Sequence, residues 1–262
     1  HYGKPLICTY SGGKDSDVML ELFKRSGVPF EVHNSHTTVD APPTVYHIRD
    51  TFRDLELAGI PCTIHMPKLT MWELIPQKKI PPTRMKRYCC DTFKENSAPH
   101  RFVATGVRWA ESSRRAFRQE VEPRGTELAK KILKLDDNDR KRALIERCEI
   151  KADMIANPII DWPNRDIWDF YWNECKSHNI QYKMGYTRVG CIGCPMAGKH
   201  RWKEFADYPT YQRAYIRAFD KMIDAIRAAK KTCKWKNGYD CFLWWMEDTN
   251  VEGQLSMFDD VE

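Results

Sequence analysis

The sequence predicts an α/β fold in which a parallel sheet has helices on both faces, followed by a mainly helical C-terminal portion. Two observations support this prediction. Short apolar segments typical of buried strands alternate with helical stretches through the first half of the chain. A glycine turn joins the first strand to the first helix. The strands are expected at residues 5–10, 29–34, 62–66 and 101–107.

The helices of the first half are predicted from apolar spacing and from the residues that end them. The first helix runs from the glycine turn to Arg25 and is closed by Gly27, because glycine is common just after a helix. The second helix ends at Gly59. Its apolar stripe consists of Val45, Ile48, Phe52 and Leu55.

The second half is predicted to be mainly helical. Asn164 or Asp166 can cap a helix that carries several large apolar residues. Long helical patterns follow over about 208–230 and 239–247.

Composition divides the chain into four parts. They are a nucleotide-binding α/β core at 1–118, a charged insertion at 119–150, a helical portion with the second cysteine pair at 151–246, and an acidic flexible tail at 247–262. The strong charge of residues 119–150 indicates an insertion with exposed helices or an arm over the site.

The overall composition is that of a globular intracellular protein. With 262 residues, of which 42% are hydrophobic, the chain can bury a substantial core. No apolar run approaches the length of a membrane span, and the first residues lack a signal-peptide pattern. The chain starts at His1 without Met, which leaves a trimmed targeting segment open. We therefore expect a soluble, cytoplasmic protein.

Positive charge is concentrated in the body of the chain. The net charge is +6, but residues 247–262 hold six acids and no Lys or Arg, so residues 1–246 carry 42 basic against 30 acidic residues. A basic body favours an anionic partner, either a nucleotide or a nucleic acid, although a solvated basic surface would look the same. The basic groups nearest the expected site are Lys78, Lys79, Arg84, Lys86, Arg87, Arg108, Arg114, Arg115 and Arg118.

The strongest local signal lies between the first strand and the first helix. It is the segment Ser11-Gly12-Gly13-Lys14-Asp15-Ser16. The two glycines allow a tight turn and a close approach to a ligand. The helix directs free N–H groups and its positive end at the loop, and the serine hydroxyls and Lys14 add donors and charge. This predicts a pocket for a pyrophosphate or sulfate-like anion. The alternative is an ordinary Gly-Gly turn with a serine cap.

This segment matches the SGGxDS signature of the PP-loop ATP pyrophosphatases, whose fold is adenine nucleotide alpha hydrolase-like. Three further segments resemble the phosphoadenosine phosphosulfate (PAPS) reductase-like family. They are HTTVDAP at 36–42, TGVRWAESSRR at 105–115 and NPIIDWPNRDIW at 157–168. The resemblance covers about residues 5–205, and by it the chain is identified as a member of the PP-loop superfamily.

The resemblance implies roles for individual residues. The nucleotide is expected to contact Ser11, Gly12, Gly13, Lys14, Asp15, Ser16, Thr37, Gly106, Arg108 and Arg115. The expected catalytic residues are Lys14, Asp15, Ser16 and Arg108. The implied ligand is ATP with Mg²⁺, or else adenylyl sulfate or PAPS.

Four of the ten cysteines form two close pairs. They are Cys89, Cys90, Cys191 and Cys194. In a reducing compartment such pairs are typical of metal or iron–sulfur ligands, and zinc or free thiols are the alternatives to a cluster. The pattern resembles the cluster-bearing adenylylsulfate reductases and the iron–sulfur sulfurtransferases of DNA phosphorothioation. The resemblance implies that these four cysteines hold a [4Fe–4S] cluster. The other six are expected to be packed as small hydrophobes.

Two chemistries fit the loop. A reductase would hold the sulfate of an activated nucleotide while a cysteine attacks its sulfur. An ATP pyrophosphatase would adenylylate an acceptor for sulfur transfer. The reductases of the family carry a nucleophilic cysteine in a C-terminal Glu-Cys-Gly-x-x-His tail, and no cysteine follows Cys241 here. This favours adenylylation and sulfur transfer onto a nucleic acid, DNA first, with a sulfur-donor protein such as a cysteine desulfurase. The third alternative is a non-catalytic nucleotide-binding subunit of a nucleic-acid complex.

The acidic tail contains Gln254-Leu255-Ser256-Met257-Phe258, which resembles the pentapeptide that docks bacterial DNA proteins on the sliding clamp. A flexible tail with apolar anchors suits such docking. The alternative is a tail that folds back on the body of the chain.

Overall fold

The structure is a computed structural model. It describes residues 3–94, 98, 100–111, 115–123 and 154–247. The chain divides into two compact units, each assembled from two segments: His1–Pro67 with Cys90–Gly190, and Lys68–Cys89 with Cys191–Glu262. Most of the charged stretch 119–150 and nearly all of the acidic tail, including Gln254–Phe258, lie outside the described residues.

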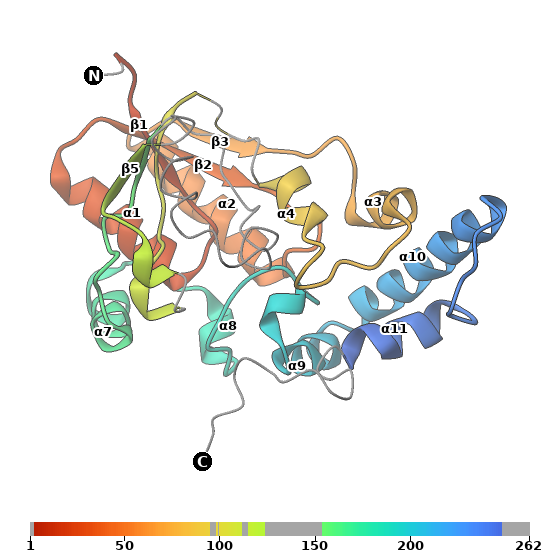
Figure 1. Ribbon diagram of the computed structural model, residues 1–262. Helices are drawn as coiled ribbons and strands as arrows, with labels where there is room; N and C mark the ends of the chain where they lie inside the picture. Colours follow the sequence, from red (N-terminus) through yellow and green to blue (C-terminus); the bar gives the residue numbers. More distant parts are fainter. Residues whose placement is uncertain (1–2, 95–97, 99, 112–114, 124–153, 248–262) are drawn as a thin grey trace. The chain divides into compact units, whose positions relative to one another are not determined.

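The first unit is built on one sheet (Figure 1). Its strands are β1 (Leu6–Thr9), β2 (Phe30–Ser35), β3 (Cys62–His65), β4 (Phe102–Ala104), β5 (Val121–Pro123) and β6 (Met154–Ala156). Their order is β3-β2-β1-β4-β6-β5, and every neighbouring pair is parallel except β5 and β6. The predicted α/β class and the four predicted strands are therefore confirmed, whereas β5 and β6 were not predicted.

The helices of the first unit are α1 (Lys14–Ser26), α2 (Pro42–Leu57), α7 (Asn164–Glu174), α8 (Ile180–Lys183) and the short 3₁₀ turns Trp109–Glu111 and Arg115–Phe117. The predicted cap of α7 is wrong, because Pro163 precedes the helix and both Asn164 and Asp166 lie inside its first turn. Helix α1 ends at Gly27 in the left-handed conformation that the sequence suggested (φ 69°). Helix α4 (Tyr88–Phe93) crosses the boundary between the two units.

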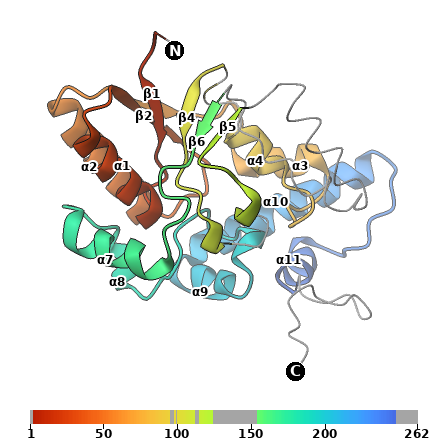
Figure 2. The same cartoon turned by 60° about the vertical axis from the view of Figure 1, so that its left-hand side comes forward.

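Helices α1 and α2 cover the same face of the sheet (Figure 2). Met19 of α1 and Phe52 of α2 pack in one cluster with Cys8 and Val32 of the strands. The strand order explains this, since β1, β2 and β3 are added in one direction and right-handed crossovers then keep both helices on one side. Ala98 packs in a separate cluster with Ile7 of β1, Val103 of β4 and Ile155 of β6.

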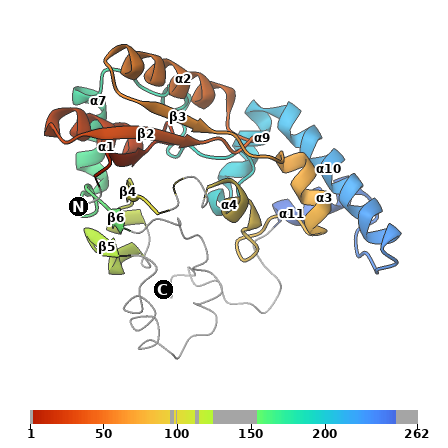
Figure 3. The same ribbon diagram turned by 90° about the horizontal axis from the view of Figure 1, so that it is seen from above.

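The second unit is helical. It contains α3 (Met71–Lys78), α9 (His200–Asp207), α10 (Pro209–Ala228), α11 (Gly238–Met246) and the 3₁₀ turn Pro195–Ala197. Helix α10 packs against both α3 and α11 (Figure 3). Tyr215 and Trp245 are buried in the second unit, and their ring centroids are 4.8 Å apart. The Trp245 indole donates a hydrogen bond to the Pro82 carbonyl at 2.6 Å. The helical patterns predicted at 208–230 and 239–247 are thus confirmed. No helix in the described ranges is long and apolar enough to cross a membrane.

Candidate functional site

The glycine loop lies where β1 ends and α1 begins, at the carboxyl edge of the sheet. Gly12 has φ 70°, and a Cβ at this position would lie 2.8 Å from Cγ1 of Ile48, so both the backbone conformation and the space require glycine. The Ser16 hydroxyl accepts the N–H groups of Gly13 (3.1 Å) and Ser11 (3.3 Å). The loop therefore closes over the first turn of α1, whose free N–H groups and positive end favour an anion.

Asp15 lies between two cations. Its Oδ2 is 2.7 Å from Nζ of Lys14, and its Oδ1 accepts a hydrogen bond from Nε of Arg108 at 2.7 Å. Nζ of Lys14 also lies 5.3 Å from the centre of the Trp168 ring, within the range of a cation–π contact. Three of the predicted catalytic residues, Lys14, Asp15 and Arg108, are therefore brought into one network.

Arg108 is only 1% exposed, and protein groups bind each part of its guanidinium. Besides Asp15, it donates to the Trp162 carbonyl (3.1 Å) and to the Asn164 side chain (3.0 Å). A guanidinium presents its donors in a fixed planar fork, so this arrangement sets the position of the Asp15 carboxylate. Arg108 thus joins the segment after β4 to the start of α1 and to the start of α7.

The segment after β4 approaches the loop closely. A Cβ on Gly106 would lie 3.3 Å from the backbone carbonyl of Asp15, which leaves little room for any other residue. Thr105 donates a hydrogen bond to Oδ1 of Asn157, the residue after β6, at 2.5 Å. The predicted second nucleotide segment is therefore at the same sheet edge as the glycine loop, as the carboxyl ends of parallel strands must be.

The remaining predicted nucleotide contacts have other partners. Thr37 follows β2 and is buried, and its N–H donates to the Asp40 carboxylate at 2.8 Å. Arg115 forms an ion pair with Glu111, one helical turn earlier. The contacts of these residues with a nucleotide stay predictions.

Two residues that the sequence did not single out hold the glycine loop from a distant part of the chain. The Tyr182 hydroxyl accepts the N–H of Lys14 at 2.8 Å, and the Asn179 side chain donates to the Gly12 carbonyl at 2.8 Å. Burial raises the pKa of Tyr182 above its usual value, so the phenol is neutral. The Tyr182 hydroxyl is therefore hydrogen-bonded to one of the N–H groups at the start of α1. An anion that binds to this N–H group must displace the hydroxyl.

A buried polar cluster lies behind the loop. The Tyr10 hydroxyl donates to Oδ1 of Asp17 at 2.5 Å, and Nε2 of His47 lies 3.1 Å from the same oxygen. Burial, and then the charge of Asp17, raises the pKa of Tyr10. The cluster joins β1, α1 and α2 and fixes the helix that follows the loop.

Three of the four paired cysteines belong to the second unit. They are Cys89 on α4 and, in one turn, Cys191 and Cys194, whose backbones are joined by a 3.2 Å hydrogen bond. Burial, followed by the thiols of Cys191, Cys89 and Cys194, raises the pKa of Tyr215 well above its usual value, so all three thiols are within electrostatic range of this phenol. Cys90 falls in the first unit.

The chemistry of these thiols suits a cluster, but the described residues do not form a closed metal site. Among them, no three His, Cys, Asp or Glu side chains are placed closely enough to hold a metal ion. The assignment of Cys89, Cys90, Cys191 and Cys194 as ligands therefore stays a prediction.

Burial disfavours the thiolate form of most of the other cysteines. Burial raises the pKa of Cys62, Cys175 and Cys241 to about 12, and that of Cys8 further still. Such thiols stay protonated at neutral pH and are poor nucleophiles. Cys233, in the loop between α10 and α11, is partly exposed, and Cys148 lies outside the described residues.

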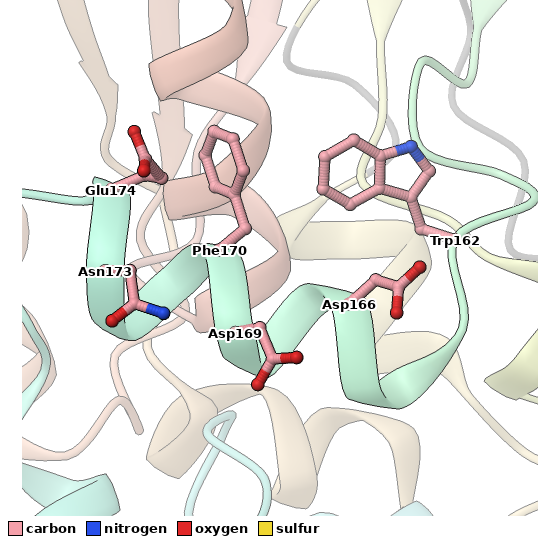
Figure 4. Close-up of a pocket in the computed structure, with 6 residues that line it drawn as sticks. All are labelled: Trp162, Asp166, Asp169, Phe170, Asn173 and Glu174. Atoms are coloured by element: carbon pink, nitrogen blue, oxygen red, sulfur yellow. The ribbon is translucent and has the colours of Figure 1, made fainter.

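A shallow depression on the outer side of α7 does not suit a nucleotide (Figure 4). It is lined by Trp162, Asp166, Asp169, Phe170, Asn173 and Glu174. Three of these side chains are carboxylates, which repel phosphate and sulfate. The glycine loop, with a helix N-terminus and Lys14, remains the better anion site.

The chain is similar to proteins named adenosine 5'-phosphosulfate reductase and to uncharacterized proteins. It is 24% identical over 234 residues and 23% identical over 229 residues to two uncharacterized proteins of Methanocaldococcus jannaschii. It is 25% identical over 203 residues to the adenosine 5'-phosphosulfate reductase of Geobacillus thermodenitrificans, with 74% of each chain covered. The chain spans less than half the length of the first two relatives, 42% and 47%.

A solved structure of phosphoadenylyl-sulfate (PAPS) reductase from Candida auris, in complex with phosphate, aligns with a TM-score of 0.44 and 16% identity. The alignment covers 72% of this chain and 81% of the other. The family model of the phosphoadenosine phosphosulfate reductase domain matches residues 5–197. Because this match includes well over half of the 262 residues, the chain belongs to the phosphoadenosine phosphosulfate reductase domain family.

Proposed function

We propose that the chain is an ATP pyrophosphatase that adenylylates an acceptor and so prepares it for sulfur transfer. The acceptor we favour is a nucleic-acid backbone, DNA first, as in phosphorothioation. The proposal uses the anion loop, which can hold the β- and γ-phosphates of ATP at the start of α1.

One observation favours adenylylation of an acceptor over reduction of a sulfonucleotide. A reductase needs an accessible thiolate to attack sulfur. Four of the described thiols outside the two cysteine pairs, Cys8, Cys62, Cys175 and Cys241, are kept protonated by burial. Adenylylation needs no thiol of the enzyme, only a phosphate cradle and a cation for the leaving group.

The proposed reaction is a displacement at the α-phosphorus of ATP. An acceptor oxygen forms a bond to this phosphorus, and the bond from it to the bridging oxygen of the β-phosphate breaks, which releases pyrophosphate. Lys14 and the loop N–H groups stabilise the charge that develops on the pyrophosphate. A sulfur nucleophile from a donor protein then forms a bond to the activated centre of the acceptor. The bond from this centre to the adenylylated oxygen breaks, and AMP leaves with that oxygen. Because both oxygens of Asp15 are paired with cations, Mg²⁺ would be held mainly by the phosphates of its MgATP substrate.

Lys14→Ala tests the proposal. Pyrophosphate release from ATP is measured under anaerobic conditions with and without DNA. We expect DNA to stimulate release and Lys14→Ala to lower it by about 100-fold, as for loss of one charge-stabilising donor. Lys24→Ala is the matched control, because Lys24 lies on the same helix and pairs with Glu21 away from the loop.

Release that does not depend on Lys14 would contradict the proposal. ATP binding without any release would instead support a non-catalytic nucleotide-binding subunit. The assay is repeated with the sulfur donor, a protein such as a cysteine desulfurase, so that a missing partner is not mistaken for inactivity.

The alternative is reduction of adenylyl sulfate or PAPS, and one observation favours it. Cys233 is partly exposed and could supply the thiolate. If the chain is such a reductase, we expect thiol-dependent sulfite production from adenosine 5'-phosphosulfate and no pyrophosphate release from ATP. Cys233→Ser should abolish the sulfite production.

We further propose that Cys89, Cys90, Cys191 and Cys194 hold a [4Fe–4S] cluster. Support comes from the position of three of these thiols in the second unit, within electrostatic range of Tyr215. Thiolates are the usual ligands of such clusters, and a bound cluster would supply an electron-transfer centre. The proposal also requires a reducing compartment such as the cytoplasm.

Iron analysis tests the cluster. Anaerobically purified protein is expected to contain about four iron and four sulfide per chain and to show the visible absorbance of a cluster. Cys191→Ser and Cys194→Ser should lose most of the iron, whereas Cys233→Ser should retain it. Stoichiometric zinc, or full iron in the Cys191 variant, would overturn the assignment.

The sliding-clamp interaction through Gln254–Phe258 stays a proposal as well. Deletion of residues 254–258 should abolish binding to a purified bacterial clamp and leave pyrophosphate release unchanged.

A further inference from the structure

The loop between α10 and α11 concentrates positive charge. Residues 225–236 contain no Asp or Glu, and their cations are Arg227, Lys230, Lys231, Lys234 and Lys236. All five side chains are exposed. None forms a salt bridge with another residue in the part of the chain that the structure describes. We call this loop, with the adjoining ends of the two helices, the hairpin tip (Figure 1).

The hairpin tip is held in a defined conformation by hydrogen bonds at the start of α11. The N–H of Gly238 donates to Asp220 of α10 at 2.6 Å, and Asn237 caps α11 by accepting the N–H of Asp240 at 2.9 Å. A Cβ on Gly238 would lie 2.2 Å from the Ile216 carbonyl, so the two helices touch backbone to backbone here. The lysines therefore extend from a fixed turn, not from a long free loop.

Aromatic rings lie among these charges. The rings of Trp235 and Trp244 are 5.0 Å apart, and Nζ of Lys234 lies 3.7 Å from the centre of the Trp244 ring and 4.9 Å from that of Trp235. Trp244 is 38% exposed and Tyr239 is 55% exposed. The indole N–H of Trp235 has no acceptor among the described residues. Exposed rings beside unpaired cations are typical of sites for single-stranded nucleic acid, in which cations contact phosphates and rings contact bases.

We propose that the hairpin tip is a binding surface for single-stranded nucleic acid. The five cations contact the phosphodiester backbone, and the exposed aromatic side chains contact the bases. The purpose of this binding, to hold the polymer whose backbone is modified, rests on the proposed function. The binding itself follows from the charge and the exposed rings, and it does not require ATP.

The experiment measures binding of the full chain, without ATP, to a fluorescent single-stranded oligonucleotide by anisotropy at several salt concentrations. In the tip variant Lys230, Lys231, Lys234 and Lys236 are changed to Gln. The control variant changes Lys4, Arg49, Lys68 and Lys176 to Gln, which are also exposed and remove the same charge. Thermal unfolding of both variants should match that of the parent, because all eight side chains are on the surface.

We expect the tip variant to bind at least about tenfold more weakly and the slope of log K against log salt to fall by about 2 to 3, as the loss of four phosphate contacts predicts. The control variant should bind nearly as the parent does. Equal weakening in both variants, or no weakening in the tip variant, would overturn the proposal. So would tip-dependent binding to vesicles of anionic lipid with no binding to the oligonucleotide.

The outcome is independent of the proposed reaction. Lys14→Ala should bind the oligonucleotide as the parent does, even though its pyrophosphate release is lost. If pyrophosphate release is never observed but tip-dependent binding is, the proposed function fails and the binding surface stands.

Discussion

Replacement of Arg108 by Met is expected to destabilise the first unit by about 3–5 kcal/mol, because it breaks a buried ion pair and leaves polar partners without a donor. The Asp15 carboxylate would then form an ion pair with Lys14 alone. The Trp162 carbonyl and the Asn164 side chain would each lose a hydrogen bond. Denaturant unfolding followed by tryptophan fluorescence measures the loss. Arg108→Lys should recover little of it, since an ammonium cannot reproduce the three-way fork.

Arg53→Met is the control for loss of an arginine ion pair. Arg53 pairs with Asp50 on the surface of α2, where both side chains are about two-thirds exposed, so its loss should cost at most about 1 kcal/mol. A double-mutant cycle of Arg108→Met with Asp15→Asn measures the coupling energy of the Arg108–Asp15 pair. We expect the effects of these two changes on stability to be clearly non-additive. Equal stability of the Arg108 and Arg53 variants would show that the Arg108 network does not hold this edge of the sheet.

Gly193→Ala is expected to destabilise the second unit strongly. Gly193 lies between Cys191 and Cys194 with φ 73°, and an added Cβ would be 2.7 Å from Cζ of Phe205 and 2.9 Å from Cη2 of Trp245. The left-handed conformation costs an alanine about 1 kcal/mol, and overpacking of a buried core costs about 1–3 kcal/mol more. We expect a total loss of roughly 2–4 kcal/mol in thermal or denaturant unfolding.

Gly27→Ala separates the two contributions. Gly27 follows α1 in the left-handed conformation (φ 69°, ψ 3°), and no atom lies within 4 Å of an added Cβ. It should show the conformational cost alone, about 1 kcal/mol. If Gly193→Ala were as mild as Gly27→Ala, the ring cluster around Gly193 would have to be looser than the structure indicates.

Local signals in the sequence predicted most of the fold. Glycines at 12, 13 and 27 and the apolar spacing around Ile48 located the loop and both flanking helices, because these signals act over a few residues. The strand β6 is three residues long and has no such signal. That α1 and α2 share a face follows from strand order, which depends on pairing between distant segments.

The residues of the candidate site also include some that local signals predicted and some that they did not. The loop residues and Arg108 could be named from motifs, but Tyr182 and Asn179, which hydrogen-bond to the loop from almost 170 residues away, could not. A tyrosine or asparagine in a short helix has many uses, and only the tertiary fold decides that its polar atom meets a loop N–H or carbonyl. The same holds for the buried pairing of Arg108 with Asp15, since the motif suggested a contact to the nucleotide instead.

The two-segment construction of each unit has a consequence for synthesis on the ribosome. The segment Lys68–Cys89 is made before β4 and β6, yet its helix α3 packs against α10, which emerges more than 100 residues later. Until then Met71, Leu74 and Ile75, all buried in the finished protein, have no α10 to pack against. The nascent chain therefore exposes these apolar side chains through about half of its translation, and transiently exposed apolar surface of this kind is what chaperones bind.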